Sequence, residues 1–458
     1  MERYKEVMDR ARDHHLKGEI GDALSLYDKC LVFSPNEPFL MFCMGCAFAQ
    51  VQQFGLAIDL LTRVTALRPE LADAWHNLGI SYRTMGLVDK AEECYQKELA
   101  TGTLSQTDTA VVYANWSGCY VNEGMPERVV ELADMGLRYN PESVELRNHK
   151  ALALLELGKY EEGFALYEAR YNLSIFHRRD YKAAPRWDGK PVGKLAIHGE
   201  QGIGDEILFL SYLKQILPLT QEIAVECTPK LVGLLRHSFR NEPKLKFYPD
   251  HDALIAAFKA DAWCAMGSLP VYVGRLLPNV YLEASRAYFR SERPRLGISW
   301  RGGTLRTHEY HRNAPIEYWQ SFVERIKSYG IDVISVQYGP AKDMAKQLGI
   351  PHDEDNIADI DTLAGMIRSC DRIVSVCNTT IHMAGALGVP CTVLVPSKPA
   401  WRYGLTGEKS DWYESVDYIR QAKGEAWDAV MARATKQTEE WAKNAYYRTL
   451  SEPQRAKA

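Results

Sequence analysis

An interval of 34 residues recurs along the first part of the chain. It separates three alanines and three larger residues: Ala23, Ala57 and Ala91, then Tyr27, Leu61 and Tyr95. A period of this length is typical of units made of two antiparallel helices, each of which buries its apolar side only against its neighbours. We therefore expect the N-terminal part to be a stacked array of helix pairs, and the remainder of the 458 residues to form separate domains.

Small residues and prolines mark the ends of these units. Gly45 and Gly79 occupy the position where paired helices touch, and Pro35 and Pro69 close the first two units. The pattern resembles tetratricopeptide repeats, and about five repeats are expected in residues 1–172. Such an array usually offers a concave face to a peptide or protein. Its large aromatic residues are expected to pack between helices: Trp75, Tyr82, Trp116 and Tyr120.

Charge and apolar content exclude several classes of partner. With 55 basic and 59 acidic residues the net charge is −4, so neither nucleic acid nor an anionic membrane is an expected partner. The first six residues lack the apolar segment of a secretion signal, and no apolar run is long enough to cross a bilayer, which predicts a cytoplasmic protein. The ten cysteines are scattered, as expected for reduced, buried thiols, and Cys43 and Cys46 have no second pair or nearby histidine to complete a zinc site.

A different pattern starts after the repeats. Residues 173–192 form a turn-rich connector that cannot continue a helix. Runs of β-branched and apolar residues then predict two series of strands alternating with helices: 194–198, 222–227, 245–248 and 262–266, then 296–300, 333–336, 372–376 and 391–395. The predicted fold class is therefore α plus α/β, with Rossmann-like domains at 193–290 and 291–424 and closing helices at 425–458.

The loop after the first strand, residues 199–205, contains three glycines, so a ligand can approach its backbone closely. It lacks the Lys-Ser/Thr ending of a phosphate-binding Walker loop, and its glycine spacing differs from the dinucleotide fingerprint. Asp205 stands at the expected start of the following helix. Its carboxylate either caps that helix or faces the crevice as a general base that removes a proton from an incoming hydroxyl or amide.

Basic residues follow the strand expected at 296–300. The loop combines glycines with cationic and polar side chains: Arg301, Gly302, Gly303, Thr304, Arg306, His308, His311 and Arg312. Guanidinium groups pair with phosphate oxygens in a bidentate manner and offset the charge of a leaving group, so this loop suits a diphosphate. The alternative is a solvated basic loop.

A polar turn joins the strand at 373–376 to a helix expected at 384–387. Thr379, Thr380 and His382 lie in this turn, where unpaired backbone N–H groups and the positive end of the helix dipole would favour an anion. The alternative is a capped helix with a core histidine. Two further cations follow the last expected strand: Lys398 and Arg402.

Five segments together carry a resemblance to a known family: residues 187–189, 200–205, 297–302, 378–388 and 412–413. In this order they resemble the bacterial tetratricopeptide-repeat glycosyltransferases, relatives of heptosyltransferases and, more distantly, of O-linked N-acetylglucosamine transferase. The resemblance implies a GT-B fold, a UDP-, GDP- or CMP-linked sugar donor, transfer of a hexosyl, heptosyl or nonulosonyl group, and no required metal or other cofactor. It implies Asp205 as the base and a protein acceptor docked on the repeats, such as flagellin or another surface protein.

The resemblance also implies a set of donor-binding residues: Gly202, Gly204, Trp300, Arg301, Gly303, Gln337, Asn378, Thr379, Thr380, His382 and Lys398. Many relatives have aspartate where this chain has Asn378, which leaves the nucleotide open. An Asp-x-Asp sequence at 359–361 resembles the metal-binding pair of another glycosyltransferase fold, but it precedes a helix and is expected to cap it. Two other hypotheses stay open: a non-catalytic scaffold that only binds a nucleotide sugar, and a nucleotide-sugar epimerase, which would leave the repeats unexplained.

Overall fold

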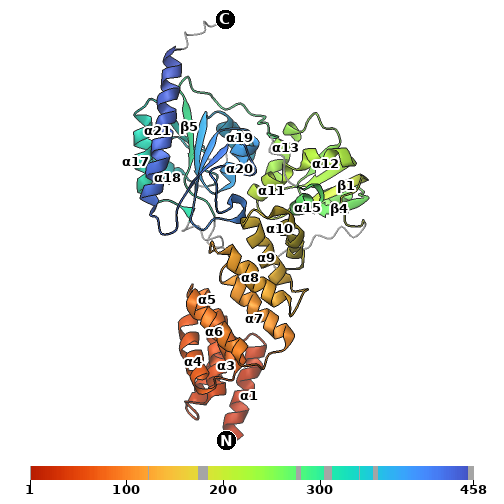
Figure 1. Cartoon of the computed structure of the whole chain (residues 1–458), viewed down its shortest axis with the longest axis vertical. Coiled ribbons are helices and arrows are strands. Elements are labelled where there is room, and N and C mark those ends of the chain that lie inside the picture. Colours follow the sequence, from red (N-terminus) through yellow and green to blue (C-terminus); the bar gives the residue numbers. More distant parts are fainter. Residues whose placement is uncertain are drawn as a thin grey trace. The chain divides into compact units, whose positions relative to one another are not determined.

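The computed structural model describes residues 2–121, 123–173, 184–274, 280–303, 312–339, 341–353 and 359–451. Arg306, His308 and His311 of the predicted basic loop lie outside these residues. The chain divides into two compact units, Met1–Leu154 with Ala169–Ser174, and Leu155–Glu168 with Ile175–Ala458 (Figure 1). The expected end of the repeats at residue 172 therefore differs from this division, because the last repeat helix belongs to the second unit.

The first unit is helical. Its helices follow one another in the order α1 (Glu2–Leu16), α2 (Ile20–Leu31), α3 (Pro38–Gln50), α4 (Phe54–Leu67), α5 (Ala72–Thr84), α6 (Val88–Ala100), α7 (Gln106–Gly118), α8 (Pro126–Leu137) and α9 (Val144–Glu156). With α10 (Tyr160–Tyr167) of the second unit, they make five consecutive helix pairs along the chain, as the repeat predicts.

Close contacts between helices explain the period. A Cβ atom added to Gly45 would lie 2.8 Å from Cγ of Leu61, and one added to Gly79 would lie 2.8 Å from Cε1 of Tyr95. Each glycine therefore leaves room for a large side chain of the paired helix, at a point where the two helices touch as predicted. Trp116 is buried in the core of this unit, and Tyr82 packs against that core.

The second unit contains two parallel sheets. The first has the order β3-β2-β1-β4, built from β1 (Val192–His198), β2 (Thr220–Glu226), β3 (Leu245–Tyr248) and β4 (Ala262–Ala265). Its helices are α11 (Ile203–Leu210), α12 (Leu213–Ile216), α13 (Val232–Ser238), α14 (His251–Ala257) and α15 (Leu269–Val273). All four strands were predicted. The helix expected at 206–216 starts three residues earlier and is interrupted between α11 and α12, so Asp205 lies inside its first turn.

The second sheet has the order β6-β5-β7-β8-β9. Its strands are β5 (Arg295–Ser299), β6 (Asp332–Ser335), β7 (Arg372–Val376), β8 (Cys391–Val395) and β9 (Val416–Arg420). Its helices are α17 (Ile316–Lys327), α18 (Lys342–Gln347), α19 (Ile360–Arg368), α20 (Thr379–Ala386) and α21 (Trp427–Ser451). The edge strand β9 was not predicted, because only alternate residues such as Val416 and Tyr418 are buried in it. Short 3₁₀ turns lie at Glu168–Asn172, Leu217–Leu219, Pro229–Leu231, Met266–Ser268 and Trp401–Tyr403.

The strand order of each sheet reverses once. The chain adds β2 and β3 on one side of β1 and then places β4 on the other side, and it likewise adds β6 and β7 on opposite sides of β5. Ligands of such sheets bind outside the carboxyl ends of the strands at the reversal point. The loops after β1 and after β5 and β7 are therefore the places where a ligand is expected.

Several expectations about single residues are confirmed. The ten cysteines are free thiols and nine of them are buried, and burial raises the pKa of Cys46 to about 12, which makes it a poor nucleophile at neutral pH. The side chain of Asp359 accepts a hydrogen bond from the backbone N–H of Asp361 at 3.0 Å, so it caps α19 as predicted.

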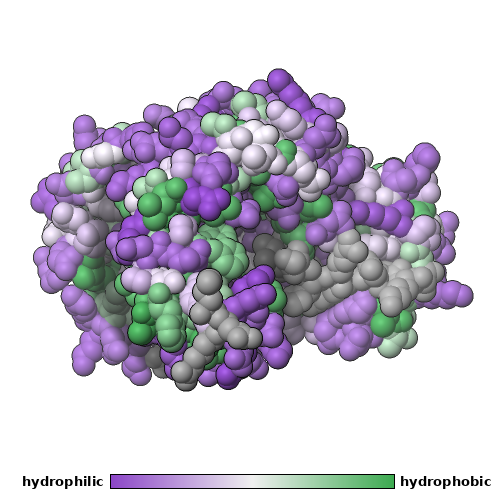
Figure 2. All heavy atoms as spheres, turned by 90° about the horizontal axis from the view of Figure 1, so that it is seen from below, coloured by the Kyte–Doolittle hydropathy of each residue, from purple (hydrophilic) through white to green (hydrophobic). Residues whose placement is uncertain are grey.

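The surface drawn in Figure 2 is mostly hydrophilic, with hydrophobic groups interspersed in small patches. No helix of the described residues has both the length and the apolar character needed to cross a membrane.

Candidate functional site

Gln337 follows Val336 at the end of β6, and its side chain fixes the backbone just after the end of β5. Its Oε1 accepts hydrogen bonds from the backbone N–H groups of Trp300 at 3.0 Å and Arg301 at 2.8 Å. Its Nε2 donates to the carbonyl oxygen of Arg301 at 2.9 Å. Both of these predicted donor-binding residues, Gln337 and Trp300, are buried. They lie under the loop after β5 and support its backbone.

Asn378 ties the ends of β5 and β7 to α20. Its Oδ1 accepts the backbone N–H of Thr380 at 2.9 Å, which makes Asn378 the N-cap of α20. Its Nδ2 donates to Oγ of Ser299 at 2.6 Å and to the carbonyl oxygen of Arg301 at 3.0 Å. A backbone N–H can only donate and a carbonyl oxygen can only accept, so this position needs both halves of an amide. An aspartate at this position could not donate to Arg301.

The cap lengthens α20 relative to the prediction. The helix starts at Thr379 and not at Ala384, so Thr379, Thr380 and His382 occupy its first turn. The hydroxyl of Thr380 is fully buried and donates to the carbonyl oxygen of Val336 at 3.0 Å. That hydroxyl therefore serves the fold, whereas Thr379 is only partly buried.

His382 is a buried imidazole on the same helix. Its Nδ1 lies 3.3 Å from the hydroxyl of Tyr413. Burial, with a smaller contribution from the Arg402 cation, lowers the pKa of His382 to about 3. It is therefore neutral near pH 7.

The first turns of α11 and α20 pack against each other. A Cβ atom on Gly204 would lie 3.1 Å from Cδ2 of His382 and 3.6 Å from Oγ1 of Thr379. The absence of a side chain at Gly204 thus allows the two helix N-termini, one from each sheet, to approach. Both carry positive partial charge at this end.

Asp205 and Arg402 meet beside these helix ends. Oδ2 of Asp205 accepts the backbone N–H of Gly202 at 3.3 Å, and Oδ1 forms an ion pair with the guanidinium of Arg402. The side chains are 18% and 17% exposed, respectively, so solvent screens the pair only in part. Burial opposes the Arg402 cation, but the Asp205 carboxylate and neighbouring tyrosines outweigh it and raise the pKa of Arg402. Asp205 is therefore both a helix-capping and an ion-paired residue.

Gln201 extends this pair toward α10. Its Oε1 accepts a hydrogen bond from Arg402 at 3.1 Å, and its Nε2 donates to the hydroxyl of Tyr167 at 2.6 Å. Gln201 has φ of 66°, a left-handed conformation that is uncommon outside glycine. The side chains of Tyr167, Gln201, Arg402 and Asp205 therefore form one connected polar chain.

This set of four connected polar side chains was only partly predicted. The sequence suggested Arg402 as an added cation, because its loop follows a strand of the second sheet, but did not pair it with Asp205. Gln201 belongs to the glycine-rich loop, and its polar character among glycines was the available signal. Nothing in the sequence singled out Tyr167, which lies in a repeat helix.

The remaining predicted residues lie around the same edge. Arg301 is exposed at the end of β5, and Gly303 beyond it has φ of 84°. A Cβ atom on Gly302 would lie 2.3 Å from the carbonyl oxygen of Cys377, so the loops after β5 and β7 touch there. Lys398 follows β8 and is partly buried.

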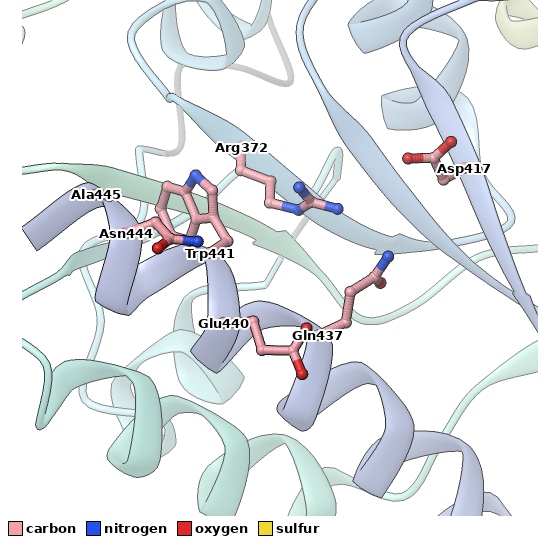
Figure 3. A pocket seen from close by; sticks show the side chains of 7 residues that line it. All are labelled: Arg372, Asp417, Gln437, Glu440, Trp441, Asn444 and Ala445. Atoms are coloured by element: carbon pink, nitrogen blue, oxygen red, sulfur yellow. The ribbon is translucent and has the colours of Figure 1, made fainter. Parts of the chain in front are cut away.

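Several hollows lie elsewhere in the second unit. One, of about 400 Å³, is at the amino end of the second sheet (Figure 3) and is lined by Arg372, Asp417, Gln437, Glu440, Trp441, Asn444 and Ala445. That edge is opposite the one where ligands of such sheets bind. A larger groove of about 990 Å³ has walls from α10, α15, the residue directly before α12 and the segment before β9, including Tyr160, Phe164, Tyr212 and Trp412.

Comparison with known proteins identifies the class of the N-terminal part. A family model described as tetratricopeptide repeat matches residues 72–97, which cover α5 and most of α6. The chain thus consists of tetratricopeptide repeats followed by an α/β part with two parallel sheets.

Among curated proteins, the chain is similar to Protein FlbA of Caulobacter vibrioides, with 24% identity over 438 residues, or 85% of this chain and 71% of that protein. BBSome complex member BBS4 of Bos taurus is 24% identical over 168 residues, 37% of this chain and 31% of that protein. A solved structure of MamA from Desulfovibrio magneticus RS-1 is 16% identical, covers 38% of this chain and 93% of its own, and has a TM-score of 0.33. A structural likeness at this level says nothing about function.

Proposed function

We propose that this protein is a glycosyltransferase that moves a sugar from a nucleotide-sugar donor to a protein acceptor held by the repeats. The observation that carries the proposal is the meeting of Asp205 and Arg402 beside the N-termini of α11 and α20, at the carboxyl edges of two parallel sheets. Two α/β domains with a ligand crevice at these edges would form a GT-B fold. The motif resemblance supports the same assignment.

The anionic part of the donor would bind at the helix ends. Two helix N-termini and a guanidinium favour a diphosphate, or the monophosphate of a CMP-linked sugar, by charge and by hydrogen bonding. Thr379 and Arg301 are the predicted contacts with side chains not committed to the core. Gln337 and Asn378 would act indirectly, by fixing the backbone of the loop after β5.

Arg402 gives a physical route to an active Asp205. In the structure the Arg402 guanidinium is ion-paired with Oδ1 of Asp205, so that oxygen is not available to an acceptor group. A donor phosphate would compete for Arg402 and release Oδ1 of Asp205. The acceptor hydroxyl or amide would then attack the anomeric carbon and give its proton to Asp205, while the bond from that carbon to the phosphate oxygen breaks and the nucleotide departs against Arg402 and the helix dipoles.

A second candidate function is a scaffold that binds a nucleotide sugar without turning it over. The engagement of both carboxylate oxygens of Asp205, by Gly202 and Arg402, favours it. The two candidates differ in one observable. Only an enzyme releases free nucleotide from the sugar, either by transfer or by slow hydrolysis.

The test has two stages. Thermal unfolding with UDP-, GDP- and CMP-sugars first finds the donor, since a ligand at about 100 times its Kd adds about 2.7 kcal/mol of stability. The stabilising donor is then incubated with the protein, and released nucleotide is measured. Binding with no release at all, with or without cell extract as acceptor source, supports the scaffold. The absence of stabilisation by any nucleotide sugar would falsify both candidates.

A further inference from the structure

Two histidines and a glutamate gather at the carboxyl edge of the first sheet. His198 is the last residue of β1, Glu226 is the last residue of β2, and His251 is the first residue of α14, just after β3. The three strands are neighbours in the order β3-β2-β1, so their ends converge. The parallel sheet therefore fixes the positions from which these side chains extend.

The distances suit a shared cation. Nδ1 of His198 lies 2.9 Å from Oε2 of Glu226, and Nδ1 of His251 lies 3.8 Å from the same oxygen. One ligand atom from each residue lies within 4.8 Å of the others. Ligand atoms on a tetrahedral zinc, at about 2.0–2.1 Å from the metal, are about 3.4 Å apart. The two nitrogen–oxygen distances differ from that spacing by about half an ångström or less.

The orientation of the two imidazoles agrees with this spacing. Their ring centroids are 5.0 Å apart and their planes are inclined by 43°. Two histidine rings bound to one tetrahedral ion place their centroids at about this separation, because each centroid lies roughly 3 Å from the metal. The edge of His198 also packs on Trp263, with centroids 5.4 Å apart, which restricts rotation of its ring.

Burial and ligand chemistry suit the cluster to a cation. Glu226 is 2% exposed and His198 is 3% exposed, so solvent would screen the attraction between the carboxylate and a bound ion only weakly. The His251 side chain is 24% exposed, so solvent reaches the cluster from that side. Two imidazoles and one carboxylate are a ligand set that suits zinc and leaves a fourth position for water.

We propose that His198, Glu226 and His251 form a binding site for a divalent transition-metal ion of the zinc class. The ion links the carboxyl ends of β1 and β2 to the start of α14, which follows β3. Its ligand His198 directly precedes the glycine-rich loop that carries Asp205. None of the three ligands is a predicted donor-binding residue, and the inference goes beyond the proposed transfer reaction: the site binds metal whether or not the protein is an enzyme.

The test is zinc binding by the untagged full-length protein after treatment with a chelator. Titration calorimetry should give about one Zn²⁺ per chain, and Co²⁺ in its place should give the visible absorption of a tetrahedral ion. His251→Ala should weaken binding by more than about 100-fold, because loss of even an outer-shell partner costs 10–100-fold. His251 starts a helix and is partly exposed, so this variant should remain folded by circular dichroism. Glu226→Gln, which preserves size, should weaken binding as well.

The first unit provides a matched control. His14, Glu19 and Asp22 also group there, and Nδ1 of His14 lies 2.5 Å from Oε2 of Glu19, but this group is largely exposed. His14→Ala should leave zinc binding unchanged. The proposal is overturned if His14→Ala abolishes binding while His251→Ala retains it, if neither substitution affects binding, or if the unmodified protein binds no zinc.

Discussion

The guanidinium of Arg402, in the loop after β8, forms an ion pair with Oδ1 of Asp205, in the first turn of α11. The two residues follow strands of different sheets, Asp205 after β1 and Arg402 after β8. Gln201 accepts a further hydrogen bond from Arg402 at 3.1 Å. The predicted base and a predicted cation are thus direct partners. A ligand that binds one of them must change the environment of the other, and this coupling sets the first two predictions.

Asp205→Asn should abolish transfer without weakening donor binding, because the donor then no longer competes with a carboxylate for Arg402. Asparagine preserves the acceptor for the Gly202 N–H but cannot take a proton, and general-base catalysis contributes about 10²–10⁴ in rate. Loss of the ionic partner of Arg402 should also lower the free energy of unfolding by about 1.5–3 kcal/mol. Nucleotide release and thermal unfolding, measured with and without donor, separate these effects. Full activity in this variant would exclude Asp205 as the base.

Arg402→Gln should weaken donor binding by about 10-fold or more, because a hydrogen bond to a charged group contributes about 1.5–3 kcal/mol. Arg368→Gln, an exposed arginine on α19, is the matched control and should bind donor normally. The Kd values come from calorimetric titration with the stabilising nucleotide sugar. Equal affinities of the two variants would mean that Arg402 acts only as the structural partner of Asp205.

The sequence located the strands of the sheets well, because seven of the eight predicted strands are runs of mainly apolar residues buried on both faces, as in β7 and β8. It missed β9, where burial alternates with polar residues at the sheet edge. It placed the polar loops on the correct edge, since parallel strands share one direction. It could not assign the roles of side chains within those loops. The Thr380 hydroxyl points into the core and the Arg402 guanidinium points toward Asp205, because each of these groups binds a partner that is far away in the sequence.

Asn378 illustrates the same limit. The sequence places it in a polar turn without giving its role, whereas in the structure its amide donates to Arg301 and accepts from Thr380. Asn378→Asp should place a carboxylate against the Arg301 carbonyl oxygen and cost about 1–3 kcal/mol of unfolding free energy. Asn241→Asp, an exposed residue of the same unit, controls for the added charge. Urea unfolding compares the two, and an equal effect of both substitutions would contradict the proposed role of the amide.

Gly302→Ala should destabilise the second unit and disturb the loop that carries Arg301. Its new methyl group would lie 2.3 Å from the carbonyl oxygen of Cys377, so the backbone must move, at a typical cost of about 1–3 kcal/mol. Gly233→Ala in α13 is the matched control. An added Cβ has nothing within 4 Å there, and the substitution should stabilise by about 0.4–1 kcal/mol. Opposite shifts in melting temperature are expected, and a stabilising effect of Gly302→Ala would show that the two loops are not in contact.

The stability of the protein should fall as the solution becomes mildly acidic, in part through His382. Burial, and to a smaller extent Arg402, lowers the pKa of this imidazole to about 3 in the folded state, while the unfolded value is about 6.5. Between these values the unfolded chain binds more protons, so the contribution is fully present above pH 6.5 and is lost as the pH falls, by about 2 kcal/mol at pH 5. His382→Gln removes this titration, and His237→Gln on α13 is the matched control. The free energy of unfolding in urea at pH 7.5 and pH 5 should therefore change less in His382→Gln than in the other two proteins. The level of stability can shift in any variant, but only the pH dependence reports the buried neutral histidine, and the same dependence in all three would mean that His382 is accessible to protons in the folded protein.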